Sequence, residues 1–176
     1  MEILIAILAC LVTISFLVKA GFFPIKALLV VAACYAVFTW WMTTLVTELS
    51  RDVFVQMTTT RRVLLDLAVC VMLEAVVMVA FCFCSPRRPW MRLSLYYYPG
   101  LLFAPALCYF QTQLFYLVPG IDFAVMRWLS SLFVLLFVIG GSWFLRWLLG
   151  DRAVRQEMLF IINLLIMILC VAITGY

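Results

Sequence analysis

The sequence contains no histidine among its 176 residues. Histidine is a frequent general base and a common ligand of zinc and haem iron, so its absence excludes His-ligated metal sites and Ser-His or Cys-His catalytic pairs. The chain also shows no paired-acid metal motif, no glycine-rich phosphate loop and no internal repeat. We therefore expect a protein that is not an enzyme and that needs no metal or other cofactor.

Charged residues are scarce as well. They make up 11% of the chain, whereas hydrophobic residues make up 69% and the mean hydropathy is +1.24. Globular domains carry about 25% charged and about 45–50% apolar residues. The composition predicts an all-α polytopic integral membrane protein, a single bundle of about six transmembrane helices with short loops. Lipid is its expected surrounding, and a net charge of only +4 does not favour nucleic-acid binding.

Apolar runs separated by charged or turn-forming residues predict six membrane spans. They cover residues 3–18, 27–46, 63–84, 95–118, 128–145 and 158–174. The polar stretch 47–62 repeats apolar residues every four positions, which predicts an interfacial or extramembrane helix. We expect this stretch to dock a partner through its polar residues Glu48, Arg51, Asp52 and Gln56.

Glu74 is the most unusual residue of the third span. It follows Arg62 by 12 residues and precedes Arg87 by 13, which places it near the middle of the bilayer. A carboxylate at that depth is costly and normally turns inward, towards protein or a water cavity. Two interpretations stay open, a proton or cation site and a hydrogen-bonded residue that fixes helix packing. We expect the other helices to surround this one.

Other polar residues within the spans are few. Asp66 lies four residues after Arg62, the spacing of a helical ion pair near the membrane edge. Gln111 and Gln113 lie in the fourth span and Asn163 in the sixth. Amides within a span commonly form hydrogen bonds between helices, each worth about 0.6–2 kcal/mol. We expect the glutamines to meet Glu74 or another chain.

Prolines and small residues mark the second half of the chain. Pro105 falls inside the fourth span and predicts a kink there. Gly140, Gly141 and Ser142 are consecutive in the fifth span and predict a close approach of a neighbouring helix.

The distribution of lysine and arginine predicts an orientation. The segments 19–26, 85–93 and 146–157 carry eight of these residues, and the opposite side carries four. Basic loops stay preferentially in the cytoplasm. We therefore expect an integral protein of the bacterial inner membrane, with the three basic loops in the cytoplasm and both termini in the periplasm.

Two functional hypotheses fit these features. In the first, the chain is a non-catalytic subunit that scaffolds a larger membrane complex or associates with itself, because it has no soluble domain and abundant apolar side chains. In the second, it is a small proton-coupled transporter or ion-translocating subunit, in which Glu74 binds the proton and Gln111, Gln113 or Asn163 line its path. A lipid-modifying enzyme is a weaker third hypothesis.

Overall fold

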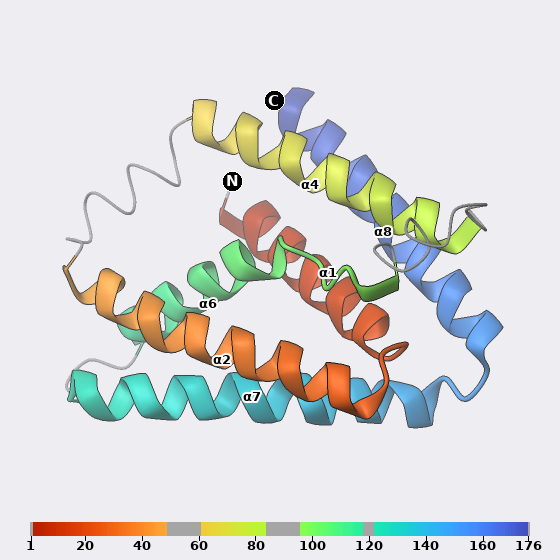
Figure 1. Ribbon diagram of the computed structural model, residues 1–176. Helices are drawn as coiled ribbons and strands as arrows, with labels where there is room; N and C mark the ends of the chain where they lie inside the picture. The colour runs from red at the N-terminus through yellow and green to blue at the C-terminus, as the bar shows by residue number, and fades with distance from the viewer. Residues whose placement is uncertain (1, 49–60, 84–95, 118–121, 176) are drawn as a thin grey trace.

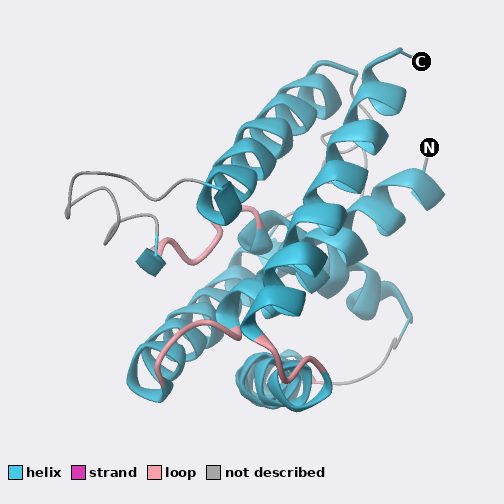
Figure 2. Ribbon diagram, turned by 90° about the vertical axis from the view of Figure 1, so that its right-hand side faces the viewer, coloured by secondary structure: helices cyan, strands magenta, loops and turns pink. Residues whose placement is uncertain are grey.

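The computed structural model describes residues 2–48, 61–83, 96–117 and 122–175, and within them regular structure is entirely helical (Figure 2). The helices are α1 (Glu2–Ala20), α2 (Ile25–Glu48), α4 (Arg61–Phe83), α6 (Phe103–Leu117), α7 (Phe123–Leu148) and α8 (Arg152–Gly175). Five of these, all except α6, are long and apolar enough to cross a membrane. The predicted all-α polytopic membrane fold is confirmed.

Two antiparallel helix pairs, α2 with α7 and α4 with α8, form the outer parts of the bundle, and α1 and α6 lie between them (Figure 1). Helix α1 contacts α6, α7 and α8. Half of its apolar stretch is buried, against 22–28% in the other four spans. The prediction that the Glu74 helix would be central is therefore wrong. Helix α1 takes that place because it is apolar on every face and carries no charge between Ile3 and Val18.

The helix boundaries extend beyond the predicted apolar runs. Helices α7 and α8 begin five and six residues earlier than predicted, and they include charged residues such as Arg127 and Arg152. Apolar length marks the part of a helix that lipid covers, and the helix continues through the headgroup region. The predicted docking residues Arg51, Asp52 and Gln56 and the side chain of Glu48 lie outside the described residues.

The fourth span differs most from its prediction. Its helix, α6, begins at Phe103 and has 15 residues, so it is about 22 Å long. Residues 98–100 are non-helical and lead into a turn at 101–102, and Gly100 has a φ of 89°, a conformation that favours glycine. Pro105 falls in the first turn of α6, where proline is tolerated. The predicted kink is thus replaced by an interruption before the helix.

The small residues of α7 let it approach α1 closely. A Cβ built on Gly141 would lie 3.1 Å from both methyl carbons of Leu17, a core residue of α1. A Cβ built on Gly140 would meet nothing within 4 Å. The close approach expected from this run of small residues is thus present, and Gly141 carries it.

These two glycines give a matched test of the packing. Gly141→Leu is expected to destabilise the bundle by about 1–3 kcal/mol because the new side chain overfills the contact with Leu17. In Gly140→Leu the new side chain points into open space, so stability is expected to stay unchanged. Thermal unfolding of the two variants in detergent measures the difference. Equal unfolding midpoints would contradict the packing described.

Candidate functional site

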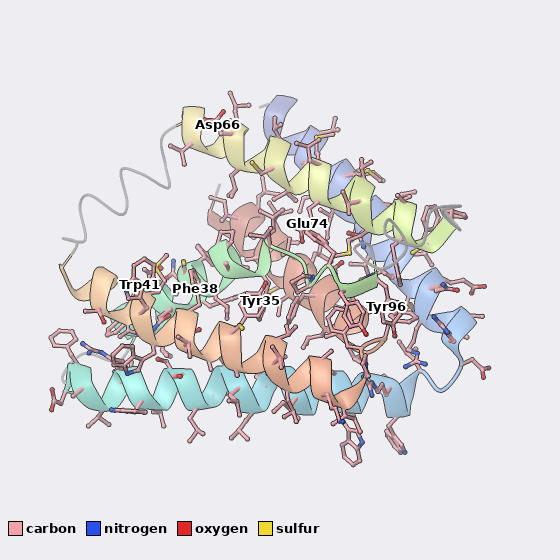
Figure 3. The ribbon with its side chains drawn as sticks, in the orientation of Figure 1. Tyr35, Phe38, Trp41, Asp66, Glu74 and Tyr96 are labelled. Atoms are coloured by element: carbon pink, nitrogen blue, oxygen red, sulfur yellow. The ribbon has the colours of Figure 1, made fainter. Side chains whose placement is uncertain are left out.

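Glu74 accepts hydrogen bonds from the segment that leads into α6. Its Oε2 atom lies 2.8 Å from the backbone nitrogen of Leu102 and 3.3 Å from the Tyr98 hydroxyl, and both groups donate to it. The first N–H groups of a helix have no acceptor within the helix and need one from elsewhere. The carboxylate of α4 therefore caps α6 from a neighbouring helix. In Figure 3, Glu74 projects into the space between α4 and α1.

The non-helical segment before α6 is held from the opposite side by Tyr35 of α2. The Tyr35 hydroxyl donates to the carbonyl oxygen of Gly100 at 2.6 Å. The Tyr35 ring packs edge-on against Phe16 and Phe103, which stack with their centroids 4.0 Å apart. Irregular backbone at membrane depth is tolerated where protein surrounds it and supplies its hydrogen bonds. Tyr35 and Glu74 meet that requirement here.

These groups lie near the middle of their helices. Glu74 is nine residues from Phe83, the end of α4, which is about 14 Å along the helix. Tyr35 is ten residues from Ile25, the start of α2, which is about 15 Å. Half of a hydrocarbon core is about 15 Å. The hydrogen bonds of Glu74 agree with its predicted turn towards protein, and its mid-membrane depth stays a prediction.

A small cavity lies beside the Glu74 carboxylate, where α1, α4, α8 and the turn before α6 meet. Its volume is about 10 Å³, room for about one water molecule. Its polar lining comes from Glu74, Ser15 and Asn163. The rest of the lining is apolar and consists of Val12, Phe16, Val71, Ala75, Leu102 and Ile166.

Asn163 fixes the α8 side of this cavity. Its Nδ2 donates to the Ser15 hydroxyl of α1 at 3.0 Å and to the Leu159 carbonyl at 2.7 Å. Asn163 is buried, with 2% of its surface exposed. The structure therefore brings together Glu74 and Asn163, two of the polar residues singled out from the sequence.

Gln111 belongs to a separate polar cluster, between α2, α6 and α7. Its Nε2 donates to the hydroxyls of Thr43 and Ser130 and to the carbonyl oxygen of Thr39. Its Oε1 is buried without a partner among the described residues. Of the two partners predicted for Gln111, Glu74 or another chain, the first is not observed, because the side chain leaves α6 towards α2 and α7. It does form the expected bonds between helices.

The remaining predicted residues lie outside both clusters. Gln113 and Asp66 are exposed, and Asp66 lies near the start of α4, far along the helix from Glu74 (Figure 3). The side chain of Arg62 is outside the described residues, so the Arg62–Asp66 pair stays a prediction.

The groups around Glu74 support few kinds of chemistry. The Glu74 carboxylate can bind a proton. The hydroxyls of Tyr98 and Ser15 and the amide of Asn163 can donate and accept hydrogen bonds beside it. Within the described parts of the chain, no three Cys, Asp or Glu residues gather as a metal site would require. Searches of protein-family models, curated proteins and solved structures find no match to the chain. Its function is therefore inferred from this geometry.

Sequence reasoning missed the partners of Glu74. Tyr35, Tyr98 and the N–H of Leu102 contribute to the site, and none was predicted as a site residue. One local signal was present: Pro99 and Gly100 are adjacent, a pair that marks turns. Read together with Pro105, it would have indicated a helix that starts late.

Proposed function

We propose that the chain is a small proton-translocating membrane protein in which Glu74 binds the proton. The observation that supports this is a carboxylate near the middle of α4 that accepts hydrogen bonds from the segment leading into α6 and lines a small cavity with Ser15 and Asn163. Ionisable residues within a span are costly and commonly mark ion or proton paths. Interrupted helices with their ends directed at charged groups are a recurrent feature of transporter sites.

Protonation would change what Glu74 can bind. The ionised carboxylate accepts from Leu102 N–H and from the Tyr98 hydroxyl. The neutral form carries an O–H of its own, which needs an acceptor, and Ser15 and Asn163 lie across the cavity. The two protonation states therefore favour different hydrogen-bond sets. A difference of this kind couples proton binding to the placement of α6 against α4.

Proton flux through the chain reconstituted in lipid vesicles tests this proposal. The vesicles enclose a pH-sensitive dye, and a potassium ionophore balances charge. We expect acidification to be faster than in protein-free vesicles and Glu74→Gln to return it to the protein-free rate. Asp66→Asn removes an exposed acid of the same helix and is expected to conduct like the unmodified chain.

Two results would refute the proposal. One is a flux through the unmodified chain no greater than that of protein-free vesicles. The other is a Glu74→Gln variant that is folded, by its thermal unfolding curve, and conducts normally.

The scaffolding hypothesis is kept as a second candidate because of the burial pattern. Only 22% of the apolar stretch of each of α4, α7 and α8 is buried within the chain, which leaves broad apolar faces that partner helices can cover. In this case Glu74 serves only to fix α6. Purification in mild detergent would then yield one partner in constant ratio, and Glu74→Gln would leave proton flux unchanged. The inner-membrane location and the cytoplasmic basic loops are part of both proposals.

A further inference from the structure

The turn between α1 and α2 is held by arginines from two other helices. Arg146, in the last turn of α7, donates through Nη2 to the carbonyl oxygens of Ala20 and Phe23. Arg155, in the first turn of α8, donates through Nη1 to the carbonyl oxygen of Gly21 at 3.2 Å. The last carbonyls of a helix have no donor within it. The two arginines supply those donors. The same hydrogen bonds hold both guanidinium groups at the turn between α1 and α2.

A third arginine joins them at Phe22. The guanidinium carbons of Arg152 and Arg155 lie 6.0 and 5.3 Å from the centroid of the Phe22 ring. Both distances fall within the range of cation–π contacts. We call Arg146, Arg152 and Arg155 the arginine cluster. Its three charges gather around residues 20–23.

The arginine cluster keeps unused hydrogen-bonding capacity. A guanidinium has five N–H groups, and the contacts above use one terminal nitrogen each of Arg146 and Arg155. The Nε atoms of these two arginines are buried without an acceptor among the described residues, so a ligand would meet their terminal nitrogens and the exposed Arg152. Asp151 and Glu157 are exposed, and neither is within ion-pair distance of the cluster in the part of the chain described. The positive charge is therefore not neutralised by these neighbouring acids.

The position of the cluster fits a membrane surface. It lies where α1, α7 and α8 meet their connecting turns, at one end of the bundle (Figure 1). Trp143 and Trp147 of α7 are 73% and 76% exposed beside Arg146 in the sequence. Exposed tryptophans gather at the headgroup level of a bilayer. Arginines at that level meet lipid phosphates directly.

We propose that the arginine cluster binds the phosphate group of an anionic phospholipid. Planar guanidinium forks match phosphate oxygens in pairs. Two of the forks are already oriented by backbone carbonyls, so little side-chain entropy is lost when the phosphate binds. The bound lipid would tie α1, α7 and α8 together at this end. This site is independent of Glu74 and of the transport proposal.

The test uses the full chain in neutral detergent with short-chain phosphatidylglycerol added. Thermal unfolding is measured against lipid concentration, and native mass spectrometry counts retained lipid. We expect phosphatidylglycerol to raise the unfolding midpoint and phosphatidylcholine of equal chain length to have little effect. Arg152→Gln removes a guanidinium whose described contact is only the Phe22 ring, so the fold is expected to persist. It should weaken lipid binding about tenfold, the ratio for one charge-assisted contact.

Two control variants separate the cluster from general charge. Lys26→Gln removes an exposed charge at the same end of the bundle and should keep the lipid effect. Arg152→Lys retains the charge without the planar fork, and it should lose most of the stabilisation by phosphatidylglycerol. Equal stabilisation by inorganic phosphate would overturn the lipid assignment. The proposed site would be overturned if Arg152→Gln and Lys26→Gln weakened lipid binding equally. It would also be overturned if the two lipids raised the unfolding midpoint equally.

Discussion

Replacing Glu74 with leucine is expected to destabilise the protein by about 2–4 kcal/mol. The change removes the acceptor of the Leu102 N–H and of the Tyr98 hydroxyl, and a buried donor left without a partner costs about 1–3 kcal/mol. Glu74→Gln is expected to lose much less, because the amide oxygen still accepts from Leu102. The free energy of unfolding of both variants, measured with a denaturant in detergent micelles, checks this.

Asp66→Leu is the control for that series. It makes the same kind of change in the same helix at an exposed position. Since it removes no hydrogen bond described here, it is expected to leave stability unchanged or slightly improved. If Glu74→Leu is as stable as Asp66→Leu, the start of α6 does not depend on the carboxylate. The capping role would then be wrong, whatever the transport measurements show.

Gly100→Ala is expected to have an effect of similar size, about 2–5 kcal/mol. A left-handed conformation costs a residue with a Cβ about 1–2 kcal/mol, and Gly100 has a φ of 89°. The new Cβ would also lie 3.0 Å from Glu74 Oε1 and 3.2 Å from the terminal methyl carbon of Met78, and overpacking of this kind costs about 1–3 kcal/mol. Thermal or denaturant unfolding measures the loss.

Two comparisons make the Gly100 result specific. Gly150→Ala adds a Cβ that meets nothing within 4 Å, and its φ is not in the left-handed range, so it should not destabilise the chain. The Gly100→Ala change should also cost less in a Glu74→Ala background, because the crowded carboxylate is gone. Residues in contact show such non-additivity. Additive losses would mean that the two positions do not interact.

Much of the architecture could be predicted from the sequence because apolar length is a strong signal. A run of about 20 apolar residues has few alternatives to a membrane helix. The predicted depth of Glu74 rests on the same count. The start of α6 could not be obtained in this way, because residues 95–102 are apolar enough to continue a helix. The helix starts late because Pro99 and Gly100 break it and because contacts with α2 and α4 hold that segment, and apolar length carries no information about either cause.

The partners of the polar residues were harder to predict for a related reason. Gln111 and Glu74 both lie in mid-bundle, yet their side chains face different neighbours. Which helix faces which residue depends on helix rotation and on the order of helices around the bundle. The central place of α1 also depends on the order of helices around the bundle. It is this place that brings Ser15 of α1 to Asn163 of α8.

The arginine contacts at the first turn bear on how the chain is assembled during biosynthesis. Arg146 is synthesised 123 residues after Phe23. Arg155 is synthesised 134 residues after Gly21. Until those arginines emerge, the carbonyls of the first hairpin must be satisfied by water or by the insertion machinery. The turn between α1 and α2 is therefore completed only after α7 and the start of α8 have been made. Nascent chains that stop before Arg146 should remain open to proteolysis at this turn.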